Sequence, residues 1–392
     1  MSELQERADV STPVPHEPPS RSPSWLTRLA LPPTRRPGQG STMLRHLLFA
    51  IVAIALLVGL TYRLQPYWNY QLASIAAYLC AVAGLTVLTG LGGQVSLGHS
   101  ALMATGAYTV ALTENAFSNH NVTTQWTLVL SLLAGVAVTS VLGLVIGLAA
   151  ARLRGPYLAG LTLAVAVTVP AITSAYAGVF NGDQGLSVAV APPPLSLGAT
   201  FPPEQWEAWI AIVAAAIVML ILANLVRSRF GRTIRAVRDD EIAAQLAGIN
   251  VARTQVITFV VSAACAGLGG GVIAAINQAV SPDSYSLTLS LYLLLAIVLG
   301  GLGSLMGAVW GAIAIVLLPY FTTQVMNNFT LSPAENVKLK DNVPLAIFGL
   351  ALIVIAIAAP GGLQGLLRRL GRLARTWMRR HGAASTSAKP AP

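Results

Sequence analysis

The chain has 392 residues, of which 55% are apolar and only 10% are charged. Soluble domains carry about 25% charged residues, and the mean hydropathy here is +0.67. This composition excludes an ordinary soluble enzyme and predicts an all-α polytopic membrane protein. The net charge of +10 does not indicate nucleic-acid binding, because the basic residues sit in short clusters beside long apolar runs. Cys80 and Cys265 lie inside apolar runs, where we expect small buried side chains and neither a disulfide nor a metal site.

Proline content and apolar runs divide the chain into three parts. Residues 1–43 contain eight prolines and no apolar period, which predicts a disordered N-terminal tail. Residues 44–360 form the predicted transmembrane domain, and residues 361–392 a basic tail. Leucines and arginines recur in that tail at helical spacing, as in an amphipathic helix on membrane lipid. A simple stop-transfer charge cluster is the alternative.

A membrane helix needs about 20 apolar residues, and the chain offers ten candidate segments. They are 47–62, 72–91, 101–113, 126–151, 156–178, 206–226, 255–276, 288–303, 304–325 and 344–360. Segments 101–113 and 288–303 are short and bounded by glycines. We therefore take these two as candidates for half-helices or re-entrant pieces.

The distribution of basic residues fixes the expected orientation. With the N-terminus inside, the cytoplasmic pieces 1–46, 152–154, 227–253 and 361–392 hold 6, 2, 6 and 7 Lys and Arg residues, 21 of the 24. Cytoplasmic loops are enriched in Lys and Arg, so both termini are predicted to be cytoplasmic. On this topology the loop 179–205, which contains no basic residue, is external, and its prolines make it extended or turned.

Two groups that an energised carrier or enzyme requires are missing from the sequence. No charged residue falls in the core of an apolar segment, whereas a proton-coupled carrier usually has a titratable group at membrane depth. The three lysines, Lys338, Lys340 and Lys389, do not follow glycine, so the chain has no phosphate-binding loop. We expect no cofactor and no catalytic residue. If ATP drives the protein, a partner subunit binds it.

Two glycine-rich breaks separate apolar segments at 90–100 (GLGGQVSLGHS) and 300–307 (GGLGSLMG). Their similar order suggests a degenerate internal duplication. Glycines allow a helix to break, and the freed backbone groups must be satisfied by protein or by a water-filled path. Close packing of small residues without solute contact is the alternative, and His99 could equally be a neutral, hydrogen-bonded side chain. The candidates for lining a translocation path are Gly93, Gln94, Ser96, His99, Ser100, Gly301, Gly303 and Ser304.

The internal loop 227–254 has the features of a short structured unit. Asp239 and Asp240 are suited to capping a helix, Glu241 would lie in its first turn, and Gly248 suits its C-terminal end. Ala244 and Gly248 would share a face small enough to enter a partner's cleft. A solvated basic loop is the alternative. The candidate coupling residues are Arg235, Arg238, Asp239, Asp240, Glu241, Ala243, Ala244 and Gly248.

Several stretches, in order and spacing, resemble the permeases of branched-chain amino acid ABC transporters. They are Gly93–Leu102 (GQVSLGHSAL), Leu153–Leu158 (LRGPYL), Asn181–Leu186 (NGDQGL), Gly231–Asn250 (GRTIRAVRDDEIAAQLAGIN), Ser281–Ser286 (SPDSYS) and Gly300–Leu305 (GGLGSL). The resemblance covers about 80–360, and the second and third stretches are similar to the longer of the family's two permease subunits. The tail 1–43 has no counterpart in the family. The chain also has Thr168, Pro170, Thr173 and Tyr176 where family members often carry an acidic or aromatic residue.

The resemblance implies an importer of five parts in the bacterial plasma (inner) membrane. This multi-pass chain would be one permease. Its partners would be a second permease subunit, two cytoplasmic ATPase subunits and an external solute-binding protein. The loop 227–254 would then be the coupling loop to the ATPases. Leucine, isoleucine and valine are the expected solutes. Urea or short-chain amides are the alternative solutes, and a secondary carrier or channel is the less supported class.

Overall fold

The computed structural model describes residues 41–122, 124–153, 156–198 and 200–327, together with 343, 346–347, 349–350, 354 and 362–367. The chain separates into two units, Met1–Leu44 and Arg45–Pro392, and nearly all the described residues belong to the second. The predictions for residues 1–40, for most of segment 344–360 and for residues 368–392 lie outside the described residues. Residues 362–367 are helical.

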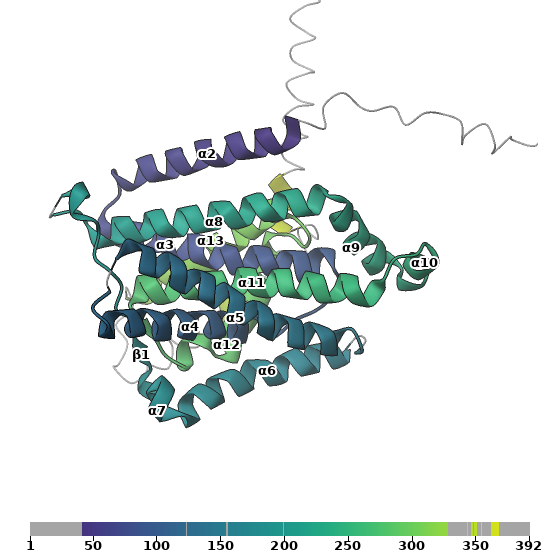
Figure 1. Ribbon diagram of the computed structural model, residues 1–392. Helices are drawn as coiled ribbons and strands as arrows, with labels where there is room; N and C mark the ends of the chain where they lie inside the picture. Colours follow the sequence, from purple (N-terminus) through teal and green to yellow (C-terminus); the bar gives the residue numbers. More distant parts are fainter. Residues whose placement is uncertain are drawn as a thin grey trace, which may run out of the picture. The chain divides into compact units, whose positions relative to one another are not determined.

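Long helices make up most of the described residues (Figure 1). Eight of them are long and apolar enough to cross a membrane, which confirms an all-α polytopic membrane protein. The helices are α2 (Ser41–Thr61), α3 (Pro66–Leu85) with the π-helix η1 (Thr86–Leu91), α4 (His99–Asn119), α5 (Gln125–Ala150), α6 (Pro156–Ala175), α7 (Ala177–Phe180), α8 (Pro203–Arg227), α9 (Arg229–Asp239), α10 (Glu241–Leu246), α11 (Val251–Asn277), α12 (Leu287–Gly300) and α13 (Leu305–Asn327).

The two short segments differ from their predicted bounds. Helix α4 is a continuous helix of 21 residues, about 30 Å long at 1.5 Å per residue, so it is longer than the predicted segment 101–113. It is not one of the eight helices above, and a half-helix or re-entrant piece there stays a prediction. The apolar run stops at Thr113 because a glutamate follows, but the helix continues for six more residues. Helix α12 has only 14 residues and follows the 3-10 turn η4 (Asp283–Tyr285). Together they form the 18-residue stretch Asp283–Gly300, which is one of the eight that are long and apolar enough to cross a membrane.

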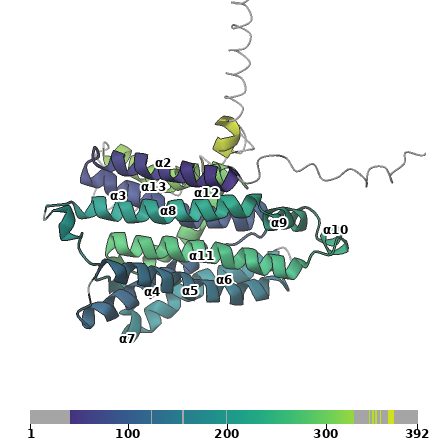
Figure 2. The same cartoon turned by 45° about the horizontal axis from the view of Figure 1, so that its top comes forward.

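Helix α11 is the central element of the bundle. It lies between α3 and α8 on one side and α4 and α5 on the other in both views (Figure 1, Figure 2). Glycines permit this packing: a Cβ on Gly270 would overlap the carbonyl oxygen of Met103 in α4, and a Cβ on Gly106 would overlap the backbone of Gly267. Lipid is as apolar as the side chains, so the hydrophobic effect does not drive membrane helices together. They associate instead through close packing of this kind.

A short strand pairing closes the end of the bundle that carries α7. Strand β1 (Leu186–Ser187) pairs antiparallel with β2 (Ala279–Val280), which follows α11. On its other side, Asn115 of α4 donates from Nδ2 to the Ser187 carbonyl at 2.7 Å and accepts from the Ala189 amide at 3.1 Å. Residues 186–189 of the loop 179–205 are therefore held between Asn115 of α4 and the strand that follows α11. Helices α9 and α10 lie at the opposite end of the bundle (Figure 1).

Burial distinguishes lipid-facing positions from packed ones. Large apolar side chains on α2 and α5 are exposed, among them Phe49, Leu133 and Val141. Exposed apolar residues on membrane helices are satisfied by lipid. Cys80 and Cys265 are buried, as predicted. Gly84 lies against the Cys265 side chain where α3 passes α11.

Adding a side chain at the centre of the bundle should disrupt it. We expect Gly270→Val to lower the stability of the purified protein by about 3 kcal/mol or more, because overpacking against a backbone carbonyl cannot be relieved by a rotamer change. Gly59→Val on α2, where a Cβ meets nothing within 4 Å, is the matched control. Thermal unfolding followed by size-exclusion fluorescence measures both. Equal melting temperatures for the two variants would contradict the close α4–α11 packing.

Candidate functional site

The first glycine break is a widened helix end followed by a chain reversal. Helix α3 continues into η1, and the Gly92 and Gly93 amides donate back to the carbonyls of Val87 and Thr89 at 3.0 and 3.2 Å. Gly93 has a φ of +70°, a conformation that favours glycine. The chain then turns until Gly98 precedes α4. The predicted break is thus a junction between α3 and α4 at the α9–α10 end of the bundle.

The second break joins α12 to α13 and touches the first. Gly301 and Gly303 have φ values of +116° and +78°, and the Ser304 amide donates to the Gly301 carbonyl at 3.2 Å. A Cβ on Gly303 would lie 3.2 Å from the Gly90 carbonyl oxygen, and a Cβ on Gly90 would overlap the Gly303 amide nitrogen. The two glycine breaks, more than 200 residues apart in sequence, therefore meet backbone to backbone.

The polar side chains of the first break are hydrogen-bonded inside the bundle. His99 is fully buried, with Nε2 2.9 Å from Ser262 Oγ on α11 and Nδ1 3.4 Å from Ser96 Oγ. The Ser100 amide donates to Ser290 Oγ on α12 at 3.0 Å. Gln94 Nε2 donates to the Gln255 carbonyl at 3.4 Å. These contacts are those of the packing alternative, and the lining of a path by these residues stays a prediction.

Helix α9 is held on the end of the bundle by an N-terminal cap, by buried apolar side chains and by a hydrogen bond to α8. Ser228 caps it by accepting from the Gly231 amide at 3.3 Å. Ile234 and Val237 are buried, and Arg235 Nη2 donates to the Val226 carbonyl at the end of α8 at 2.8 Å. Arg235 therefore anchors α9 to α8 and is not a freely solvated charge.

Helix α10 is a separate short unit with its own cap. Asp240 Oδ1 accepts from the amides of Ile242 and Ala243 at 2.9 and 3.0 Å, so Asp240 is the capping residue. Asp239 is paired with Arg238 and does not cap it. Glu241 begins the helix and accepts from Gln255 Nε2 of α11 at 3.0 Å.

The exposed face of α10 is not the one expected from the sequence. Ala244 is buried against Val237 and Val251, so the prediction that it shares a docking face with Gly248 is wrong. The side chains that point outward are larger: Ile242 is 71% exposed and Leu246 is 86% exposed. The six-residue helix therefore turns Ala244 toward Val237 of α9 and Val251 of α11.

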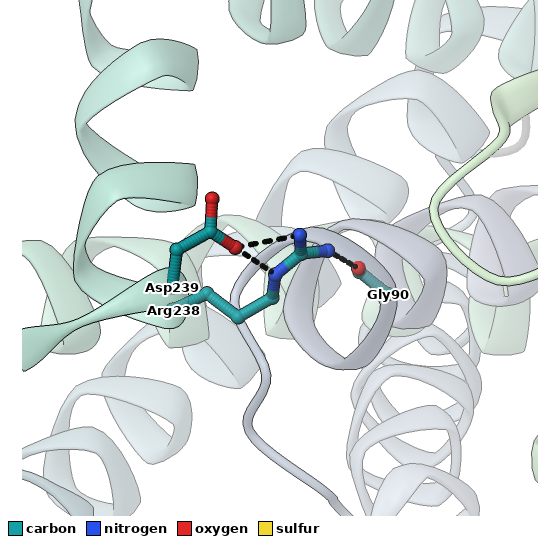
Figure 3. Close-up of polar contacts among 3 residues, drawn as sticks. All are labelled: Gly90, Arg238 and Asp239. Atoms are coloured by element: carbon teal, nitrogen blue, oxygen red, sulfur yellow. Dashed lines mark hydrogen bonds and ion pairs between the residues drawn. The ribbon is translucent and has the colours of Figure 1, made fainter.

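Arg238 connects α9 to the first glycine break (Figure 3). Its Nε and Nη2 donate to one carboxylate oxygen of Asp239 at 3.0 and 2.7 Å, and its Nη1 donates to the Gly90 carbonyl at 3.0 Å. The stem of the same side chain covers Gly93, where an added Cβ would lie 2.7 Å from Cγ of Arg238. The internal loop 227–254 and the glycine breaks are therefore connected through Arg238.

Sequence reasoning missed a buried acid. Glu114, 2% exposed, lies within α4 and accepts from Ser131 Oγ at 2.8 Å and from Thr127 Oγ1 at 3.2 Å, both on α5. The prediction that no charged residue lies in the core of a membrane segment is therefore wrong for α4, which contains Glu114. Two hydroxyls four residues apart at the start of α5 were the available signal, because they share the face turned toward α4.

The other end of the bundle has a cavity of about 160 Å³ beside Glu207 and Gln278. Apolar residues of α5, α8 and α11 and residues 190–193 of the loop 179–205 form most of its wall. Glu207 accepts from Gln278 Nε2 at 3.5 Å. Among the described residues no cluster of three or more His, Cys, Asp or Glu side chains is arranged to hold a metal ion.

Comparison with known proteins identifies the family. The model of the branched-chain amino acid transport system permease component matches residues 68–356. The chain belongs to this family. It is therefore a transport permease component and a multi-pass membrane protein.

The relatives include both permease subunits of the high-affinity branched-chain amino acid transport system. LivM of Escherichia coli is 27% identical over 353 residues, which cover 84% of this chain and 77% of LivM. LivM of Salmonella typhimurium is 28% identical over 312 residues, 74% of this chain and 68% of LivM. LivH of Salmonella typhimurium is 25% identical over 312 residues, 78% of this chain and 96% of LivH. No solved structure matches the chain.

The end of α10 depends on glycine for conformation and not for space. Gly248 has a φ of +81°, and an added Cβ would meet nothing within 4 Å. Gly248→Ala should destabilise the turn by about 1 kcal/mol, which is about a fivefold change in its opening equilibrium. Hydrogen exchange of the amides of 241–250 measures this. Gly248→Asn is the control, since asparagine tolerates this conformation, and identical exchange for the alanine and asparagine variants would contradict the assignment.

Proposed function

We propose that this chain is the membrane-spanning permease subunit of an ATP-driven importer of branched-chain amino acids in a bacterial plasma membrane. The observation that carries the proposal is the α9–α10 unit. It is folded and anchored to the bundle, yet it presents Ile242 and Leu246 to its surroundings. Exposed apolar side chains on an otherwise polar segment mark an interaction site.

A cytoplasmic ATPase subunit is the partner that fits this surface. The sequence contains no phosphate-binding loop, so the energy of ATP must reach the chain through a protein contact. Ile242 and Leu246 are one turn apart on the same face of α10, which suits insertion into an apolar cleft. Two such ATPase subunits would serve this permease and a second one.

The remaining partners follow from the family and from topology. The relatives include two different permease subunits, LivM and LivH, which supports a second permease beside this chain. The Lys and Arg distribution supports cytoplasmic termini and ten spans. The end of the bundle with α7, β1 and the loop 179–205 would then face outward and receive the solute-binding protein.

The proposed cycle uses no covalent chemistry in this chain. The binding protein delivers the solute to the outer face. ATP binding closes the ATPase pair, and this motion displaces α10 and the inner ends of the helices it contacts. The permease then alternates the side to which its path opens. Binding of ATP and its hydrolysis take place on the partner subunits.

Cysteine labelling tests the orientation. Leu195 in the loop 179–205 and Leu246 in α10 are each 86% exposed. We expect Leu195→Cys to react with an impermeant maleimide in intact cells and Leu246→Cys to react only after the cells are opened. The native cysteines are buried and should give little background. Labelling of both variants in intact cells would contradict the proposed topology.

Charge placed on α10 tests the ATPase contact. We expect Leu246→Asp to reduce co-purification of the ATPase subunits and leucine uptake by about tenfold or more, because burying an unpaired carboxylate in an apolar contact is strongly unfavourable. Insertion of the chain in the membrane should be normal, since Leu246 lies outside the membrane helices.

Leu195→Asp is the control, because its side chain is equally exposed at the other end of the bundle. Its ATPase co-purification should equal that of the unmodified chain. Normal co-purification with Leu246→Asp would remove α10 as the docking element. If the unmodified transporter takes up labelled urea but not leucine, the proposed solute is wrong and urea is the solute.

A further inference from the structure

The structure assigns Arg238 a positioning role in coupling: it transmits movement of α9 and α10 to both glycine breaks at once. This inference rests on the proposed function, because it needs an ATPase that moves α10. It adds a route inside the membrane protein that the docking surface alone does not provide. The route runs from Arg238 to Gly90 (Figure 3). It continues from Gly90 to Gly303, whose backbones are in contact.

The first step is the fixed orientation of the guanidinium. Arg238 Nε and Nη2 both bond Asp239 Oδ1, at 3.0 and 2.7 Å. A guanidinium is planar, so holding one edge fixes the direction of its remaining N–H groups. Nη1 consequently points toward η1. Asp239 ends α9 and Asp240 caps α10, so this ion pair sits at the joint between the two helices.

The second step is the contact with the end of η1. The amides of Gly92, Gly93 and Gln94 donate to the carbonyls of Val87, Thr89 and Leu88. The Gly90 carbonyl follows those acceptors in the chain, and it accepts from Arg238 Nη1 at 3.0 Å. A charged donor to a backbone carbonyl forms one of the stronger hydrogen bonds in proteins. The stem of Arg238 fills the space that the absent side chain of Gly93 leaves.

The third step carries the contact to the other break. The backbones of Gly90 and Gly303 touch, with no side chain between them that could absorb a displacement. On the far side of the same break, a Cβ on Gly362 would lie 2.5 Å from the Gly301 Cα. A shift of the Gly90 peptide must therefore move the α12–α13 junction together with the α3–α4 junction. Close-packed contacts of this kind transmit small shifts and do not absorb them.

A role in stability alone does not account for this arrangement. The side chain of Arg238 is 41% exposed and that of Asp239 is 64% exposed, and exposed ion pairs contribute little to folding. Loss of Arg238 should therefore leave the chain folded while it disconnects α9 from the breaks. That separation makes the inference testable in the complete transporter.

The test compares Arg238→Met with Arg232→Met, a matched control on an exposed position of the same helix. The transporter is purified through a tag on this chain and reconstituted in liposomes with its ATPase subunits. For Arg238→Met we expect normal ATPase co-purification and normal basal ATP hydrolysis. Leucine uptake and leucine-stimulated hydrolysis should both fall about tenfold, the scale set by loss of one charge-assisted hydrogen bond. Arg232→Met should resemble the unmodified chain.

A second readout follows the route itself. Leu302 is exposed between the glycines of the second break, so Leu302→Cys reports on that junction. With a non-hydrolysable ATP analogue bound, its maleimide labelling rate should change in the unmodified background and with Arg232→Met. It should not change with Arg238→Met. Should Arg238→Met fold poorly, Arg238→Lys, which keeps the charge but not the planar fork, replaces it under the same criteria.

Three results would overturn the inference. Uptake and nucleotide-dependent labelling in Arg238→Met equal to those of Arg232→Met would show that the Gly90 contact carries no movement. Loss of ATPase co-purification in Arg238→Met would make Arg238 a docking residue instead. Absence of any ATPase from the unmodified, tagged transporter would defeat the proposed function and the inference with it, and that result appears before any variant is made.

Discussion

Direct contact between helix backbones at glycine is the constraint on which this structure depends. In a membrane the lipid is as apolar as the side chains, so helices associate through close packing and hydrogen bonds. Here α11 meets α4 where Gly270 faces the Met103 carbonyl and Gly267 faces Gly106. The same device recurs at the α9–α10 end of the bundle, where Gly90 and Gly303 touch. At these contacts the helices of the bundle therefore meet backbone to backbone, with no flexible side chain between them.

A broken helix within such a body must satisfy the backbone groups that the break frees. At the first break, the amides of Gly92, Gly93 and Gln94 donate to carbonyls of η1, and the guanidinium of Arg238, from outside the membrane helices, donates to the Gly90 carbonyl. The break is therefore complete only when α9 is in place. This dependence explains why the two features that the sequence marked separately, a glycine-rich segment and a basic loop, belong to one site.

The sequence predicted the positions of the helices better than it predicted which side of each helix is buried. Apolar runs predicted the positions of most long helices, and capping chemistry predicted α10, with Asp240 before it and Gly248 after it. The α4 boundary failed because Glu114 was taken as the end of an apolar run, whereas hydroxyls of α5 allow it to be buried. Ala244 failed because its burial depends on Val251, the first residue of the next helix. Contacts between elements decide such cases, and local pattern does not contain them.

The division between a rigid bundle and the small α9–α10 unit bears on how the proposed permease would respond to ATP binding on its partner subunits. A ligand shifts a conformational equilibrium only through a difference in its interaction with the two states. The ATPase would contact Ile242 and Leu246, which lie outside the membrane helices, so the difference must reach the bundle through α9 or through the contacts of α10 with Gln255 and Val251 of α11. Of the polar contacts of α9, Arg235 holds the end of α8, whereas Arg238 holds the junction where α3, α4, α12 and α13 converge. The contact of Arg238 with the Gly90 carbonyl therefore links α9 to four helices at once. A tilt of α9 about the Arg235 contact with α8 would act on all four.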